Sequence, residues 1–121
     1  MGIAIVLLTA LVGILHLYFL YFEMFAWTTT GKRIFNKYPA EFFKQSKSLA
    51  ANQGLYNGFL AAGLFWTFLI QDASWQSNIR IFFFGCVAVA GIYGALTADR
   101  KIFFVQALPA ILGILFLVIA K

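Results

Sequence analysis

The sequence is poor in charged residues and in residues that cross-link chains or bind metals. Only 11% of the 121 residues are charged, nine Lys or Arg against four Asp or Glu, and there is one cysteine and one histidine. A single cysteine excludes an internal disulfide. One histidine with so few carboxylates is too small a ligand set for zinc. The basic residues are not interleaved with polar groups on a soluble face, so we expect no nucleic-acid partner.

Hydrophobic residues dominate instead, at 63% of the chain, and 15 residues are phenylalanine. A soluble domain of this length cannot hide that much apolar surface, because small domains bury only a modest fraction of their surface. The N-terminus lacks the basic segment of a signal peptide, and its apolar run is too long for one. We therefore interpret the N-terminal run as a true membrane span.

Four apolar segments follow one another, at about 3–27, 49–70, 79–96 and 102–120. Each is close to the roughly 20 residues that cross a bilayer as a helix. Backbone groups in lipid must be satisfied within the segment, which favours helices over open strands. The sequence predicts one all-α domain, an integral membrane four-helix bundle, whose third span is the shortest.

Basic residues set the expected orientation. The first loop, 28–48, carries five Lys or Arg against Glu41, and the third connection carries Arg100 and Lys101. The second connection, 71–78, holds Asp72 and no basic residue. The positive-inside rule places loops one and three in the cytoplasm and both termini outside. Within loop one, Pro39 and the residues after it predict a short interfacial helix that rests on the lipid bilayer.

Polar side chains interrupt the first two spans. His16 and Glu23 lie in the first, and Asn52, Gln53 and Asn57 open the second. Such groups are costly in hydrocarbon, so they mark a site, a pathway or an interhelical contact. His16 and Glu23 are two helical turns apart on one face, about 10 Å along the axis. All five are expected in the cytoplasmic half of the bundle.

Tyr93, Thr97 and Gln106 are expected in the same half, which leaves the outer half almost wholly apolar. One inward-open pocket would explain this distribution. Interhelical hydrogen bonding, at about 0.6–2 kcal/mol per bond, is the alternative. We favour that alternative for Tyr93, Thr97 and Gln106, although Tyr93 and Gln106 are kept as candidate ligand contacts. For the three amides at the start of the second span, the two interpretations are equally weighted.

Glu23 has no basic partner within the spans. Its carboxyl group must be protonated, reached by water, or hydrogen-bonded to donors such as the Asn52 or Gln53 amides. We interpret Glu23 as functional, and His16 joins it because the two share a face. No metal site is predicted, and no cofactor is indicated: nothing beyond His16 itself supports haem.

Small residues recur every four positions in two spans. Ala50, Gly54, Gly58 and Ala62 do so in the second, and Cys86, Ala90 and Gly94 in the third. Such stripes let helix backbones approach closely. The favoured interpretation is packing of span two on span three, and a homo-oligomer face is the alternative. Pro109 predicts a kink in the fourth span.

The runs 16–18, 23–29 and 49–64, with Asn-Gln-Gly-Leu-Tyr-Asn-Gly at their centre, resemble a bacterial integral membrane family designated domain of unknown function thirteen-oh-four. The resemblance covers the whole chain and implies a small four-span protein of the bacterial inner membrane, with no established activity. A looser likeness to the membrane-associated eicosanoid and glutathione metabolism proteins is one of fold alone.

The function that we favour from the sequence is binding of a small amphipathic or lipid-like ligand. Its polar head would meet Glu23, Asn52, Gln53 and Asn57, with His16 deeper. The alternatives are a membrane isomerase or transferase in which Glu23 and His16 move protons, a small transporter, and an accessory subunit.

Overall fold

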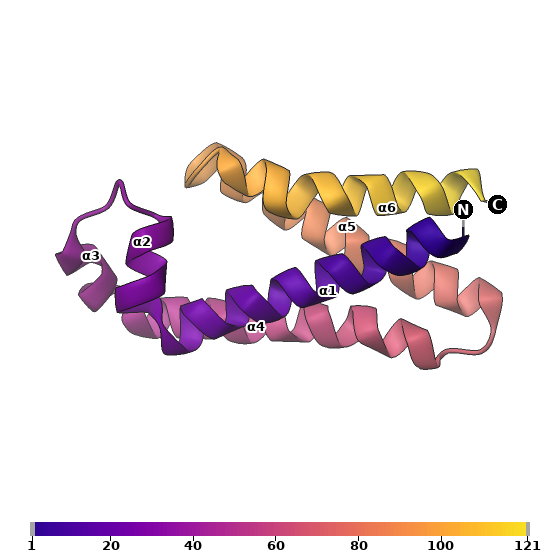
Figure 1. Ribbon diagram of the computed structural model, residues 1–121, viewed down its shortest axis with the longest axis horizontal. Coiled ribbons are helices and arrows are strands. Elements are labelled where there is room, and N and C mark those ends of the chain that lie inside the picture. The colour runs from indigo at the N-terminus through magenta and orange to yellow at the C-terminus, as the bar shows by residue number, and fades with distance from the viewer. Residues whose placement is uncertain (1, 121) are drawn as a thin grey trace. The chain divides into compact units, whose positions relative to one another are not determined.

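The computed structural model describes residues 2–120, and within them every regular element is a helix, which confirms the all-α class. Four long helices make up most of the chain (Figure 1): α1 (Gly2–Phe25), α4 (Lys47–Trp66), α5 (Ala73–Thr97) and α6 (Leu108–Ile119). Shorter helical turns join them: η1 (Trp27–Gly31), α2 (Lys32–Ile34), α3 (Ala40–Gln45), η2 (Thr67–Leu69) and η3 (Phe103–Ala107).

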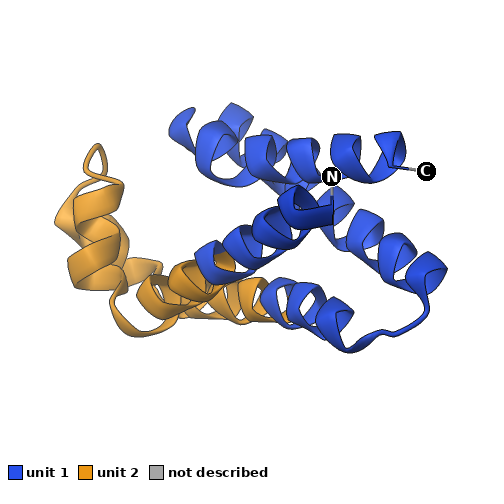
Figure 2. Cartoon of the chain, turned by 45° about the vertical axis from the view of Figure 1, so that its right-hand side comes forward, with its two compact units in different colours: residues 1–15, 60–121 blue, residues 16–59 orange. Residues whose placement is uncertain are grey.

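The chain divides into two compact units, coloured separately in Figure 2. Unit 1 combines the N-terminal residues up to Leu15 with the chain from Leu60 onward, and unit 2 is His16–Phe59. The boundaries fall inside α1 and α4, so each of these helices contributes residues to both units. The four-span domain expected from the sequence stays a prediction.

Each of the four expected spans contains a helix. Helices α1 and α5 are long and apolar enough to cross a bilayer, and the stretch Phe103–Ile119 is apolar but shorter. In α4 the apolar run is diluted by three amide side chains: Asn52, Gln53 and Asn57. The sequence indicates these same three residues as part of a candidate site. The amides of that site are therefore also the reason that α4 is less apolar than the other long helices.

The third helix begins earlier than the sequence predicted. Helix α5 starts at Ala73 and has 25 residues, so the expected shortest span is the longest helix, and only residues 70–72 separate it from η2. Asp72 caps its first turn, because its Oδ1 accepts a hydrogen bond from the backbone N–H of Trp75 at 2.9 Å. Residues 74–78 are mostly polar and resemble a loop in composition, but they form the start of α5 behind this cap.

Glycines opposite phenylalanine rings hold unit 1 together. A Cβ atom at Gly13 would lie 2.7 Å from Phe65 Cζ, and one at Gly113 would lie 2.7 Å from Phe84 Cε2. Gly63 faces the ring of Phe83 in the same way. These contacts join α1 to α4, α4 to α5, and α6 to α5. The surrounding core is apolar: Ile5, Val12, Leu64, Phe84, Val87, Ala88, Ala110 and Leu117.

The small-residue stripes pack differently from the prediction. Gly54 and Gly58 of α4 face α1, where their nearest neighbours include Leu20, so this stripe does not pair span two with span three. On α5, Gly94 of the stripe lies against Ile102, and Gly91, which lies beside the stripe, meets the backbone of Ala107. The stripe of small residues shows that a neighbouring helix can approach closely. It does not show which helix does so, because that depends on how the helix is rotated about its own axis.

Pro109 lies in the first turn of α6, directly after the π-helical turn η3. Proline has no N–H to donate to the preceding turn, and a wider π turn is one way in which a helix accommodates the lost bond. The π turn is the irregularity that lies next to Pro109, and the kink expected in the fourth span stays a prediction. In this turn Ala107 is fully buried.

In unit 2, the loop segment folds back on Trp27. The indole ring packs against four phenylalanines: Phe22, Phe35, Phe42 and Phe43. Its Nε1 donates to Ser46 Oγ at 3.0 Å. Helix α3 follows Pro39 as predicted, with Phe43 fully buried. Trp27 therefore lies inside an aromatic cluster in addition to its place at the end of a predicted span.

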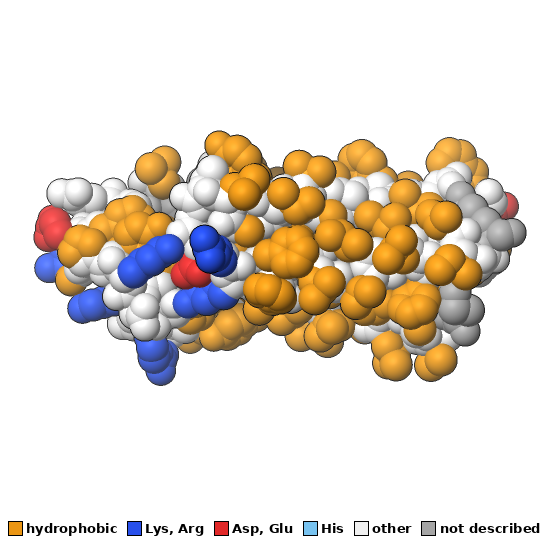
Figure 3. All heavy atoms as spheres, turned by 90° about the horizontal axis from the view of Figure 1, so that it is seen from above, with side chains coloured by type: hydrophobic (Ala, Val, Ile, Leu, Met, Phe, Trp, Pro, Cys, Tyr) orange, Lys and Arg blue, Asp and Glu red, His pale blue; other side chains and the backbone are white. Residues whose placement is uncertain are grey.

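Basic side chains lie on the surface of the segment that follows α1. Lys32, Arg33, Lys37, Lys44 and Lys47 are all exposed. On the face drawn in Figure 3, several blue Lys and Arg side chains lie close together, with a red acidic side chain among them. The basic residues of the first expected loop are therefore all on the surface.

Candidate functional site

Glu23 is the centre of a polar cluster inside unit 2. It lies in the last turn of α1, and its carboxylate faces α4. Gln53 Nε2 donates to Glu23 Oε2 at 2.9 Å, and Asn57 Nδ2 donates to Glu23 Oε1. Each carboxylate oxygen therefore accepts one amide N–H. This is the hydrogen-bonded arrangement that the sequence offered as one way to accommodate a carboxylate without a basic partner.

Helical spacing and a glycine make this cluster possible. Gln53 and Asn57 are four residues apart, so they lie on one face of α4, one turn above the other. Gly54 lies between them against α1: a Cβ atom there would be 2.8 Å from Met24 Cγ and 3.0 Å from Glu23 Cβ. The missing side chain lets the two helix backbones approach until both amides reach the carboxylate.

The cluster is buried on one side and open on the other. Glu23 is 5% exposed and Asn57 8% exposed, whereas Gln53 is exposed. Both amide N–H groups point at the carboxylate, which leaves the amide oxygens Oε1 of Gln53 and Oδ1 of Asn57 as further acceptors. Neither is a buried atom without a partner among the described residues. The cluster thus presents hydrogen-bond acceptors, and chemically it suits a ligand group that donates.

Asn52 does not belong to this cluster. Its side chain is exposed and forms no hydrogen bond with another described residue. Adjacent residues in a helix are about 100° apart, so Asn52 cannot share the face of Gln53 and Asn57. The sequence grouped the three amides by depth, and their direction around the helix separates them.

His16 is fully buried in unit 2, two turns before Glu23 on α1. Its ring meets the edge of Phe19, with the ring centroids 4.9 Å apart. About 10 Å of helix separates it from Glu23, so the two share a face as predicted without direct contact along α1. Within residues 2–120, no group of three His, Cys, Asp or Glu side chains could hold a metal ion.

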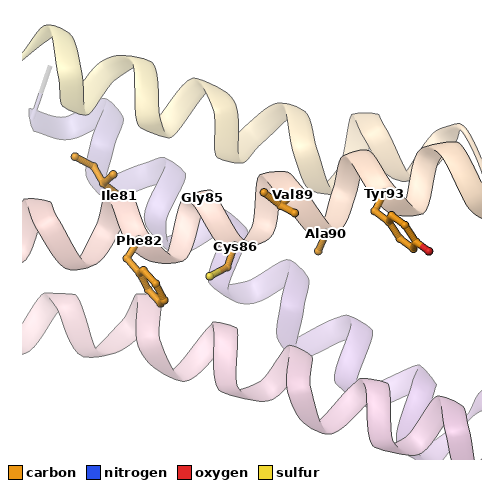
Figure 4. A pocket seen from close by; sticks show the side chains of 7 residues that line it. All are labelled: Ile81, Phe82, Gly85, Cys86, Val89, Ala90 and Tyr93. Carbon is orange, nitrogen blue, oxygen red and sulfur yellow. The ribbon is translucent and has the colours of Figure 1, made fainter.

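The remaining candidates, Tyr93, Thr97 and Gln106, belong to unit 1. Tyr93 is exposed and lies at one end of a shallow apolar groove along α5, which Figure 4 shows. The groove is lined by Ile81, Phe82, Gly85, Cys86, Val89, Ala90 and Tyr93. Thr97 Oγ1 donates a hydrogen bond to the backbone oxygen of Tyr93 at 2.7 Å, and Gln106 is half-buried in η3. Two residues of the predicted stripe, Cys86 and Ala90, therefore face this groove.

The sequence reasoning missed a second buried polar group. Arg80, in the second turn of α5, is 5% exposed, and its Nε donates to the fully buried Thr67 Oγ1 at 3.1 Å. The expectation that one half of the bundle is almost wholly apolar is therefore wrong for α5, where Arg80 lies far from Tyr93 and Thr97. An arginine inside an apolar segment was the available signal, but its place near the segment's start made it look like a boundary residue.

Comparison with known proteins gives a family and no activity. Residues 10–118 match the family described as "Protein of unknown function (DUF1304)". The chain is also similar to the "Uncharacterized protein YpaA" of Lactococcus lactis subsp. lactis (strain IL1403), at 33% identity over 117 residues. That alignment covers 95% of this chain and 97% of the relative. No solved structure matches the chain.

Proposed function

Because the chain belongs to the DUF1304 family, whose function is unknown, we propose its function from the polar cluster alone. The protein is a four-span membrane protein of the bacterial inner membrane, and it binds the head group of a small amphipathic or lipid-like molecule. Glu23, Gln53 and Asn57 contact that head group, and the phenylalanine-rich helices contact its apolar part. This proposal concerns binding and assigns no reaction.

The membrane location is supported by length, surface and charge. Helix α1 has 24 residues and α5 has 25, which is about 36 Å of helix, against a hydrocarbon core of about 30 Å. Large apolar side chains remain exposed along both helices, such as Leu7, Ile14 and Val89. Exposed Lys and Arg occur in the 28–48 segment and at 100–101, whereas residues 70–72 carry only Asp72. This pattern supports a cytoplasmic position for the two basic connections.

One observation carries the ligand proposal: a buried carboxylate that takes two amide N–H groups while the amide oxygens stay open. A cluster made only for helix packing would gain most by satisfying donors and acceptors among its own members. The open acceptors favour a ligand with hydroxyl or ammonium donors. Exposed Gln53 gives such a head group access to the buried pair.

Native mass spectrometry of the protein purified in mild detergent tests this proposal. Glu23→Gln removes the charge and keeps the shape, and Asn52→Ala is the matched control on the face of α4 outside the cluster. We expect a small-molecule adduct on the wild type and on Asn52→Ala, and its loss from Glu23→Gln. Retention of the adduct in Glu23→Gln, or no adduct on any of the three proteins, would contradict ligand binding at this cluster.

A purely structural role for the cluster predicts a different pattern in the same experiment. No adduct would appear on the wild type, and Glu23→Gln would change only the melting temperature. The mass of an adduct would also identify the ligand class: a molecule without hydroxyl or ammonium donors would be incompatible with the acceptor-rich cluster. The same spectra count the subunits, which tests the predicted homo-oligomer.

A further inference from the structure

Arg80 is a buried cation in unit 1 and is not one of the residues assigned to the proposed ligand site. Its guanidinium lies over the ring of Phe68, 5.2 Å from the ring centroid, and its Nε donates to Thr67 Oγ1 at 3.1 Å. Thr67 follows the last residue of α4, so this one side chain of α5 contacts the turn that ends α4. Burial of a charged guanidinium is costly unless an anion or several acceptors compensate for lost water.

No carboxylate supplies that compensation among residues 2–120. Arg80 forms no ion pair there, and the ion pair of unit 1 joins Lys101 to Asp99 at 3.6 Å, near the other end of α5. Asp72 is the nearest acidic residue along the chain, but its carboxylate caps the first turn of α5 about 12 Å away along the helix. The positive charge of Arg80 is therefore uncompensated within the described chain.

The guanidinium has donors left and is held in place. Its only hydrogen bond to described residues uses Nε, and neither Nη atom is a buried atom without a partner, so both reach the surface. The acceptor turn is itself fixed: Thr67 Oγ1 donates to Leu64 O at 2.6 Å, and Gln76 Nε2 donates to Thr67 O at 2.9 Å. Two parallel N–H donors on a fixed guanidinium match the spacing of phosphate oxygens.

We infer that Arg80 binds a phosphate oxyanion, and that a membrane phospholipid supplies it. The lipid source is favoured by what surrounds the turn: Leu69 is 80% exposed, Trp75 62% and Trp66 51%. Exposed tryptophans beside an arginine are typical of the level of lipid head groups. The inference rests on the membrane location proposed above and is independent of the Glu23 cluster.

The test compares two lipids with the same acyl chains, of which only one carries a phosphate in its head group. Wild type, Arg80→Gln and Arg100→Gln are mixed in detergent with equal amounts of phosphatidylglycerol and of diacylglycerol with the same acyl chains. Native mass spectra then give the ratio of the two adducts. Arg100 is the matched control, because it is an exposed arginine of the same unit. The ratio is measured on folded ions in one sample, so it does not depend on how much of a variant folds.

We expect Arg80→Gln to lower the phosphatidylglycerol-to-diacylglycerol ratio about tenfold, which corresponds to about 1.4 kcal/mol. Arg100→Gln should leave this ratio unchanged. Arg80→Lys keeps the charge without the paired donors, so its ratio should lie between those of the wild type and Arg80→Gln. An unchanged ratio in Arg80→Gln, or an equal fall in Arg100→Gln, would overturn the inference.

Inorganic phosphate, added at millimolar concentration, distinguishes the two sources of the oxyanion. Displacement of phosphatidylglycerol from the wild type would assign the site to a free anion, and no displacement would assign it to the lipid. Glu23→Gln should keep the wild-type ratio. The experiment therefore tests the proposal for Arg80 separately from the proposal for the Glu23 cluster.

Discussion

At the scale of single residues, both the stability and the proposed ligand binding depend most on the carboxyl group of Glu23. Hydrogen bonds to a charged group contribute about 1.5–3 kcal/mol, roughly twice those between neutral groups. Because Glu23 and Asn57 are both buried, neither can turn to solvent if its partner is lost. The same amides would present their oxygens to a ligand, so stability and binding depend on the same atoms and must be measured separately.

Asn57→Ala should therefore destabilise the protein by about 1–3 kcal/mol, because a buried carboxylate oxygen loses its donor. Asn52→Ala should change stability by less than about 0.5 kcal/mol, as is usual for exposed positions. Thermal unfolding followed by circular dichroism in the same detergent measures both. Equal losses in the two variants would show that Asn57 is not the special partner of Glu23.

At the scale of helices and turns, shape decides more than hydrophobicity. Most residues of α5 are apolar, so apolar character cannot say which face packs and which stays open. Gly91 and Gly85 belong to the same helix. A Cβ atom added at Gly91 would meet the backbone of Ala107, whereas one added at Gly85 would meet nothing within 4 Å. Packing of α5 on the turn before α6 is thus localised at particular glycines.

Gly91→Ala should destabilise the protein, because its new Cβ atom would lie 2.8 Å from Ala107 Cα, and backbone cannot move aside cheaply. The expected loss is about 1–3 kcal/mol. Gly85→Ala should stabilise by up to about 1 kcal/mol, since alanine is the better helix former and the space is empty. Melting temperatures of the two variants should move in opposite directions, and a common direction would contradict this packing.

The turns after α1 depend on Trp27. Trp27→Ala removes the ring around which four phenylalanines pack and should cost about 3–5 kcal/mol. Trp75→Ala is the control, because Trp75 is 62% exposed. Limited proteolysis within residues 28–46 should become much faster in Trp27→Ala and stay unchanged in Trp75→Ala. Equal cleavage rates would mean that Trp27 does not hold this segment.

At the scale of the whole molecule, charge distribution gives the proposed orientation. Exposed basic residues occur in the segments 28–48 and 100–101, and the short connection 70–72 has none. Each basic residue near an anionic membrane surface contributes about 1 kcal/mol, so the two sides differ considerably. Two sufficiently long apolar helices are compatible with several topologies, and loop charge favours the four-span one.

Single cysteines test this topology. In a Cys86→Ala background, Asn36→Cys places an exposed thiol in the 28–48 segment, and Ser74→Cys places one in the first turn of α5, directly after the connection 70–72. A membrane-impermeant maleimide should label Ser74→Cys in right-side-out vesicles and Asn36→Cys only in inverted ones. Labelling of both from the same side would reject the four-span arrangement.

Several features could be predicted from the residues alone. The helical class follows from composition and run length, and the short helix after Pro39 follows from proline's fixed φ. Glu23 could be identified as a carboxyl group without a basic partner in the spans, and hydrogen bonds from amide donors were one of the three ways to accommodate it. The start of α5 could not be found in this way, because the capping geometry of Asp72, and not composition, makes residues 74–78 helical.

The sequence by itself determined which side chains are costly to bury and how often small residues recur. Only the tertiary structure decided that Gln53 and Asn57 donate hydrogen bonds to Glu23 while Asn52 points elsewhere. It also decided that Gly54 faces α1 and that Arg80 donates a hydrogen bond to Thr67. The physical reason is rotational. Periodicity places residues on a helix, but which face meets which neighbour depends on how rings and glycines interlock between helices.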